Sequence, residues 1–324
     1  MPSSRSRWCL RSSFAIVPAV AVAALVAVPA SATNSKDLKA QVAKLNDQLE
    51  QLTEKFNQYN VQLKASQTAA DVAQQQATAA NASLDQIKTK LRQMAASSYM
   101  QGGDTDWTSL VTSSNPSAML GDSAALQYVT SHKNTEVTSL LTAAQDAARA
   151  QATANDRRTQ VQQLRDNAAT QKTKIEKLLK DNKAKLASQT SGSSSSAPPP
   201  AVKVSGNASA KALSAVQYAM SKRGKPYVYG AAGPNSFDCS GLTMWAYKQV
   251  GISLNHFTGD QVNEGTRISR SSLRPGDLVF FYSDYHHVGL YIGNNQMVDA
   301  PHTGTDVQVQ SIADRTVTAA VRVA

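Results

Sequence analysis

Cysteine is nearly absent from this chain of 324 residues, which contains two cysteines, Cys9 and Cys239. Aromatic residues make up 6% of the sequence and charged residues 17%, while Ala, Gln, Ser and Thr fill long stretches. A composition so poor in large apolar groups argues against one core that spans the whole chain. The length instead allows about two domains, which need not be of the same kind.

Long runs of one charge are also missing. The chain has 33 Lys and Arg against 23 Asp and Glu, a net charge of +10, and this excess is spread thinly. Nucleic-acid binding would require a basic stripe with interleaved aromatic residues, so we expect no nucleic-acid partner. A diffuse positive charge suits a protein that works among anionic polymers at a cell surface.

Residues 1–32 have the pattern of a secretory signal peptide. Three arginines precede an apolar run from Phe14 to Val28, which ends in the small residues of Ala30-Ser31-Ala32. The run is about fifteen residues long, which is too short to cross a ~30 Å hydrocarbon core comfortably, although an uncleaved anchor is the alternative. Cys9 precedes the run, so it cannot be a lipidation cysteine. We expect a secreted protein, located in the cell wall or outside the cell, with no stable membrane span after cleavage.

Cleavage of that signal would leave Cys239 as the only cysteine. An exported protein with one thiol has no internal disulfide partner. Cys239 is therefore either a buried inert residue or a reactive thiol.

Residues 33–187 show the heptad periodicity of a coiled coil. Apolar or small residues recur at alternating spacings of four and three, and Ser66 is the polar exception: Leu38, Val42, Leu45, Leu49, Leu52, Phe56, Tyr59, Leu63, Ser66, Ala70, Ala73, Ala77, Ala80, Leu84, Ile87, Leu91 and Met94. A weaker periodic stretch runs from Leu126 to Leu178. The intervening tip near residues 98–124 contains Gly102-Gly103 and Asn115-Pro116. We predict an antiparallel helical hairpin, with a parallel homodimer as the alternative. The hairpin carries no chemistry of its own, and we expect it to be a spacer or a docking arm.

Residues 188–209 are a Ser/Gly/Pro-rich linker, and residues 210–324 have the composition of a globular domain. There we predict helices over 210–223 and 240–250, followed by strands at 278–282, 287–292, 296–300, 306–311 and 315–323. Helices followed by antiparallel strands indicate an α+β fold.

Cys239 lies at the start of the second of these helices, where the unpaired N–H groups and the helix dipole favour a thiolate. A thiolate mechanism also needs a base. Among the histidines, His132 is predicted to be a solvated helix residue and His302 to lie in a loop. His286 and His287 begin a strand, and a cysteine at a helix start with a histidine at a strand start is a specific catalytic pairing.

Three segments carry a resemblance to a known family: PYVYGAAGPNSFDCSGL (226–242), RPGDLVFF (274–281) and HHVGLYIGNNQMVDAP (286–301). In order and spacing they resemble the NlpC family, papain-like cysteine endopeptidases that cut peptidoglycan stem peptides. The similarity covers about residues 210–324. The order of signal, coiled coil, linker and catalytic domain also resembles secreted division hydrolases of this family.

The resemblance implies that Cys239 is the nucleophile and His287 the general base, with His286 facing outward. Asp299 takes the imidazole-orienting position, where relatives usually carry His, Asn or Gln, and its charge should favour the imidazolium.

The resemblance further implies that Tyr227 lines the active site and assists the oxyanion, with the Cys239 N–H as the other donor. It places Asp238 and Ser240 near the free amine of the substrate, although helix capping explains them equally well. His256 corresponds to a polar residue of the cleft.

His287 and Asp299 can meet only if they lie on the same face of a hairpin. We predict a three-residue turn at Gly293-Asn294-Asn295, which would set Gly289 opposite Asp299. A two-residue turn would place Asp299 on the wrong face.

The sequence suggests no cofactor and no metal, because it has no short ligand pair at zinc spacing, and the G-x-S-x-G motif of serine hydrolases is absent. We therefore expect a peptidoglycan hydrolase that cuts the bond between D-γ-glutamate and the diamino acid, with the coiled coil serving for docking to a membrane division complex or for autoinhibition. The alternatives are a non-catalytic wall-binding scaffold, and an amidase or acyltransferase that uses the same thiol.

Overall fold

The structure, a computed structural model, describes residues 35–100, 135–183 and 208–324. The predicted signal peptide, the tip of the hairpin and most of the linker lie outside these residues, as does His132. No helix in the described ranges is long and apolar enough to cross a membrane.

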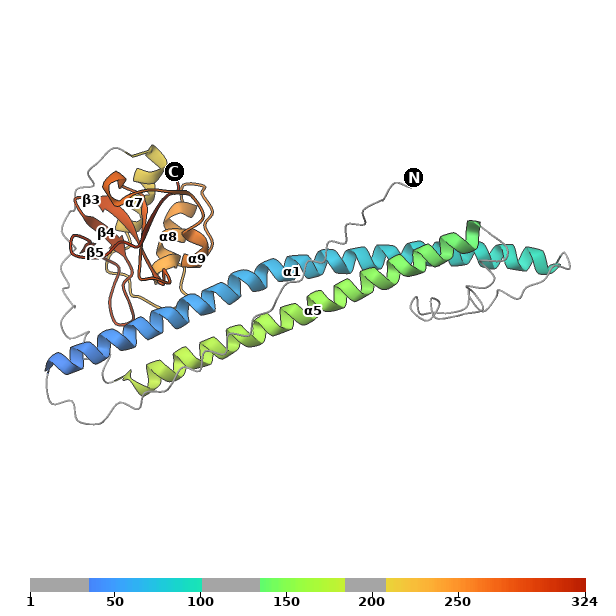
Figure 1. Cartoon of the computed structure of the whole chain (residues 1–324), viewed down its shortest axis with the longest axis horizontal. Coiled ribbons are helices and arrows are strands. Elements are labelled where there is room, and N and C mark those ends of the chain that lie inside the picture. Colours follow the sequence, from blue (N-terminus) through green and yellow to red (C-terminus); the bar gives the residue numbers. More distant parts are fainter. Residues whose placement is uncertain (1–34, 101–134, 184–207) are drawn as a thin grey trace, which may run out of the picture.

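Two long helices form the predicted antiparallel hairpin (Figure 1). They are α1 (Ser35–Met100) and α5 (Thr135–Asp181). The seam is buried at Val42, Leu45 and Leu49 opposite Ile175, and at Leu84 and Leu91 opposite Leu140. Between these two clusters, Ala73 and Ala77 pack against Ala154, where small side chains let the helices approach closely. The heptad prediction is therefore confirmed for the described part of both helices.

The second unit is an α+β domain, as predicted. Its helices are α7 (Ala210–Met220), α8 (Cys239–Lys248) and α9 (Thr258–Gln261), and a 3-10 turn, η1, spans Arg270–Ser272. The strands are β1 (Thr266–Arg267), β2 (Leu278–Phe281), β3 (His287–Gly293), β4 (Gln296–Asp299), β5 (Gln308–Ser311) and β6 (Ala319–Arg322). The sequence analysis did not predict α9, β1 or η1, which are too short to show a periodicity.

All strand pairs are antiparallel, and the sheet order is β1-β6-β2-β3-β4-β5. Alternation along the strands creates two apolar faces. One packs against α7 and α8 through side chains such as Phe280, Leu290 and Val298, and the other buries Val279 and Met297. Both cores are built only from residues of the 208–324 segment. This segment therefore has the buried apolar surface that independent folding requires.

The α+β domain sits beside the first half of α1, coloured blue in Figure 1. Phe56 of α1 meets the ring of Tyr229 edge-on at a centroid distance of 6.3 Å. The hydroxyl of Tyr229 donates a hydrogen bond to Glu176 of α5 at 3.3 Å. A Cβ at Gly230 would lie 3.0 Å from the Phe56 ring, so glycine leaves room for this contact. Both helices of the hairpin thus touch the domain.

Candidate active site

Cys239 is the first residue of α8, as the sequence indicated. Asp238 caps the helix, because its Oδ1 accepts a hydrogen bond from the Gly241 N–H at 2.7 Å. The thiol is buried and donates to Glu54 Oε1 at 3.7 Å and to the His286 carbonyl at 3.8 Å.

The expected lowering of the cysteine pKa is wrong for this arrangement. Burial raises the pKa of Cys239 well above its ordinary value, and the nearby carboxylates of Glu54, Asp238 and Glu50 raise it further. These effects outweigh the lowering of the pKa by the helix N-terminus, so the thiol is neutral while the hairpin covers it.

His287 begins β3, and its Nε2 lies 2.9 Å from Asp299 Oδ2. Both side chains are buried. Contact with the carboxylate fixes the ring and leaves Nδ1 as the nitrogen available to a thiol. In the structure Nδ1 lies 3.7 Å from Glu50 Oε2. The side chains of the candidate base and its orienting residue are therefore together, as the sequence suggested.

The turn that brings them together differs from the predicted one. Gly293 pairs with Gln296, so the loop has two residues, Asn294 and Asn295, both with positive φ (53° and 51°). A register shift between Tyr291 and Gly293 adds the extra residue inside the strand. A two-residue turn alone would put Asp299 on the opposite face of the sheet from His287. The extra residue of the bulge compensates for this, so Leu290 pairs with Val298 and the two side chains share a face. The predicted register is correct and the predicted turn is wrong.

Three further candidates lie around Cys239. Tyr227 is buried, and burial raises its pKa well above the ordinary value, so its hydroxyl keeps its proton; a thiolate at Cys239 would raise that pKa further. Ser240 donates to Glu54 Oε1 at 2.7 Å. His256 Nε2 lies 2.7 Å from Asp238 Oδ1. These candidates thus lie together at the start of α8, and His302 lies close enough to His287 and Asp299 for their charges to act on it.

We predicted that His286 faces outward, but its side chain is buried. Its side chain is 4% exposed, stacks on Tyr282 at a centroid distance of 4.0 Å, and contacts Asp284 through Nδ1. On the other side of the ring, Nε2 lies 3.1 Å from Asp47 of α1. The hairpin covers a residue that the isolated domain would expose. His302 lies in the predicted loop and contacts the carbonyl of Thr303.

The sequence analysis missed the part of the site that comes from α1. Glu54 Oε2 accepts hydrogen bonds from the N–H of Thr258 at 2.7 Å and from its hydroxyl at 2.9 Å. Asn57 donates to Asp238 Oδ2 at 3.0 Å and to Glu54 Oε1 at 3.1 Å. The hairpin therefore places a carboxylate and an amide directly on the residues that flank the nucleophile.

A second stripe in the sequence could have revealed this surface. Four polar residues repeat at spacings of four, three and four, one position after the leucine seam, and all are buried: Asn46, Glu50, Thr53 and Asn57. A polar stripe on a long helix is normally solvated, so the pattern alone did not indicate a partner.

The contact with the domain raises the pKa values of two acidic residues of α1, Glu50 and Glu54. Burial, followed by the charge of Asp238, raises the pKa of Glu54 to about 7. Burial and the charges of Asp299 and Asp47 raise the pKa of Glu50. For His256, burial acts to lower the pKa, but Asp238 and then Glu54 outweigh it and raise the pKa.

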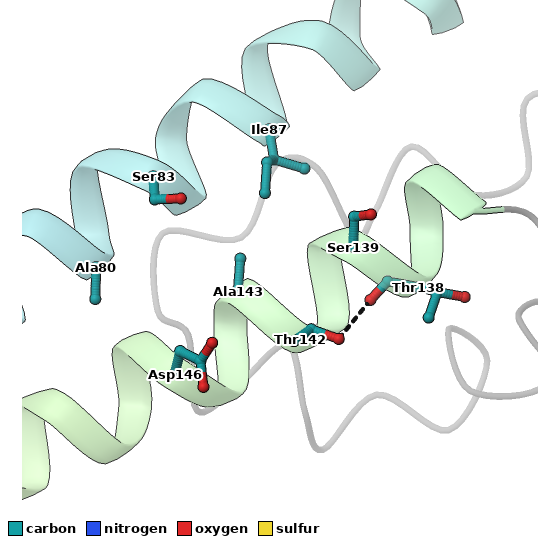
Figure 2. Close-up of a pocket in the computed structure, with 8 residues that line it drawn as sticks. All are labelled: Ala80, Ser83, Ile87, Thr138, Ser139, Thr142, Ala143 and Asp146. Carbon is teal, nitrogen blue, oxygen red and sulfur yellow. Dashed lines mark hydrogen bonds between the residues drawn. The ribbon is translucent and has the colours of Figure 1, made fainter.

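A hollow lies away from this site, between α1 and α5 (Figure 2). It has a volume of about 630 Å³ and is lined by Ala80, Ser83, Ile87, Thr138, Ser139, Thr142, Ala143 and Asp146. At ~1.5 Å per residue it lies on the order of 40 Å along α1 from Glu54. Among the described residues that line it, Asp146 is the one ionisable side chain. In the described ranges, no group of three His, Cys, Asp or Glu side chains could hold a metal ion.

The comparisons with known proteins concern the α+β domain. Residues 224–324 match the family described as "NlpC/P60 family". A probable endopeptidase of Corynebacterium glutamicum is 45% identical over 97 residues, which cover 30% of this chain and 46% of that protein. A probable endopeptidase of Mycobacterium tuberculosis is 46% identical over 94 residues, 29% of this chain and 24% of that protein.

The peptidoglycan endopeptidase RipA of Mycolicibacterium smegmatis is 40% identical over 111 residues, which cover 30% of this chain and 22% of RipA. Among solved structures, the NlpC/p60 domain of the peptidoglycan hydrolase SagA is 37% identical over 34% of this chain and 97% of that chain, with a TM-score of 0.33. This chain therefore spans less than half the length of each of the three curated relatives, and the family match lies within the second unit.

Proposed function

Starting from the NlpC/P60 domain at residues 224–324, we propose that this protein is a secreted cysteine endopeptidase that cuts peptidoglycan stem peptides. The observation that carries the proposal is the contact of His287 Nε2 with Asp299, which leaves Nδ1 free to serve a thiol at the start of α8. The relatives named as endopeptidases support the reaction class.

In the proposed mechanism, the proton of the Cys239 thiol passes to His287 Nδ1, and the thiolate attacks the carbonyl carbon of the scissile amide. The Cys239 N–H and the Tyr227 hydroxyl donate hydrogen bonds to the developing oxyanion. When the tetrahedral intermediate collapses, the C–N bond breaks and the imidazolium protonates the departing amine. Water then hydrolyses the thioester, with His287 as the base, and restores the thiol.

The substrate is the stem peptide of peptidoglycan, and the bond is the one between D-γ-glutamate and the diamino acid. The specific bond follows from the resemblance to the NlpC family. Asp238 has the charge to bind the free amine of such a peptide, and its Oδ2 now accepts a hydrogen bond from Asn57. The wall substrate in turn agrees with the predicted signal peptide and with the diffuse positive charge.

Of the two roles expected for the coiled coil, the contacts favour autoinhibition. Glu54 accepts a hydrogen bond from the Cys239 thiol. Glu50 lies 3.7 Å from His287 Nδ1, the nitrogen that should receive the proton of that thiol. These residues are one helical turn apart, so a single helix face engages both members of the proposed pair. Turnover then requires that the hairpin move away, and docking of the hairpin to a membrane division complex is a means of moving it.

The proposal is tested with a defined stem tetrapeptide and with purified sacculi, whose products are identified by mass spectrometry. The domain of residues 208–324 should release fragments that end in D-γ-glutamate, and Cys239→Ala should release none. Wall binding without fragments would indicate a scaffold, and loss of a side-chain amide or acyl transfer to an added amine would indicate the rival thiol chemistries. Equal fragment release by Cys239→Ala and the parent would refute the mechanism.

A further inference from the structure

Acidic residues face acidic residues where α1 covers the candidate site. Three carboxylates of α1 lie against three of the domain: Asp47 and Asp284 flank His286, Glu50 and Asp299 flank His287, and Glu54 lies beside Asp238. Two basic side chains act on this group: His256 Nε2 lies 2.7 Å from Asp238 Oδ1, and Arg315 lowers the pKa of Glu50. Like charges packed together in a buried contact oppose its formation unless protons are present.

Each of the two adjacent histidines lies between a carboxylate of the domain and a carboxylate of the hairpin. Asp284 lies against Nδ1 of His286 and Asp47 lies 3.1 Å from its Nε2. For His287, Asp299 is 2.9 Å from Nε2 and Glu50 is 3.7 Å from Nδ1.

Glu54 is the most enclosed of the helix carboxylates. It is 4% exposed and is contacted by Ser240, by Thr258 and by Asn57. These donors satisfy its oxygens, while burial and then the charge of Asp238 raise its pKa. Asp238 in turn contacts His256, whose proton its charge retains.

We propose that closure of the hairpin over the active site is coupled to the uptake of protons, so that the protein is held closed in acid and opens as the pH rises. The inference rests on the proposed function, because it assigns a control to the same site. No covalent step is involved. Protons from solvent bind to the carboxylates of Glu50 and Glu54 in the closed contact, and they return to solvent when α1 leaves.

The sign follows from the direction of the shifts. Glu54 has a pKa of about 7 in the closed form and the ordinary value of 4.5 when α1 is free. The closed form therefore binds more protons than the open form between these values. The stabilisation of the closed form by protonation of Glu54 is complete below about pH 4.5, declines as the pH rises, and is lost above about pH 7. Glu50 shifts in the same direction and reinforces the effect.

The experiment measures alkylation of Cys239 by iodoacetamide in the full chain, read at the Cys239 peptide by mass spectrometry. At each pH the rate is divided by the rate of residues 208–324 alone, which cancels the titration of the exposed thiol. We expect this ratio to rise by about tenfold or more between pH 5 and pH 8, since one pKa unit corresponds to tenfold. A ratio that is flat or falls with pH overturns the proposal.

Two substitutions of Glu54 should act in opposite directions. Glu54→Gln keeps the shape of the side chain without its charge, so the ratio at pH 8 should fall, and in the Glu50→Gln/Glu54→Gln double variant it should be low at every pH. Glu54→Ala removes the hydrogen bonds to Ser240 and Thr258, so the ratio should rise. Asp71→Asn, at an exposed acid of the same helix, is the matched control and should behave as the parent.

If the double variant opens with pH as the parent does, the carboxylates of α1 are not the control. Alkylation requires no substrate, so this result is independent of the peptidase assay. Failure of every form to cut peptidoglycan, with the expected alkylation profile, would refute the proposed function and leave the proton-coupled closure standing.

Discussion

Asn57→Asp should open the hairpin at neutral pH through the exchange of one amide for a carboxylate of the same shape. The Asn57 amide donates to Asp238 Oδ2 at 3.0 Å and to Glu54 Oε1 at 3.1 Å. Aspartate at this position loses both hydrogen bonds and adds a third negative charge between two others. Because all three groups are buried, we expect a cost of about 3 kcal/mol to the closed form, typical of an uncompensated charge in a buried polar contact.

This free energy corresponds to a shift of about a hundredfold toward the open form. The assay is alkylation of Cys239 in the full chain at pH 7, together with fragment release from sacculi, and both rates should rise. Asn60→Asp makes the same change at an exposed position three residues along α1 and should leave both rates unchanged. If Asn57→Asp and Asn60→Asp react alike and as slowly as the parent, then the amide of Asn57 does not hold the hairpin on the active site.

Three further predictions concern the same site. Deletion of residues 33–200 should raise the rate of fragment release, more at pH 5.5 than at pH 8, and an equal or lower rate would leave the hairpin with a targeting role alone. In residues 208–324, Asp299→Ala should lower kcat/KM by about a hundredfold because His287 is no longer oriented, while circular dichroism checks that the fold persists; unchanged kinetics would remove Asp299 from the mechanism. Tyr227→Phe should lower kcat by roughly a hundredfold with little change in KM if its hydroxyl binds the oxyanion, and a change in KM alone would assign it to substrate binding.

Much of the fold could be predicted from the sequence because its signals are strong and local. The leucine and alanine heptads continue over most of α1, and the buried seam follows them. The strands of the second domain were predictable from β-branched runs between turn residues. The short α9 escaped prediction although it matters for the site, since its Thr258 holds Glu54.

Within the site, the sequence predicted those residues whose place is set by their position in a single helix or strand. Cys239 at the start of α8 and His287 at the start of β3 are examples. The β3–β4 turn was mispredicted because a bulge and a two-residue turn give the same register as a three-residue turn. Local sequence does not distinguish these two solutions.

The state of the thiol could not be predicted from its neighbours in sequence. Cys239 and Glu54 are 185 residues apart, and burial, followed by the charge of Glu54, raises the pKa of Cys239 and reverses the effect expected of the helix N-terminus. The stripe that contains Glu50 and Asn57 was visible, but nothing in its spacing identifies the partner that buries it.

The most direct test of the account follows peptidase activity and Cys239 alkylation in the same sample of residues 208–324. As iodoacetamide modifies the protein, the remaining rate of stem-peptide cleavage should fall in proportion to the unmodified Cys239. Full activity retained after complete modification of Cys239 would contradict the assignment of this thiol as the nucleophile.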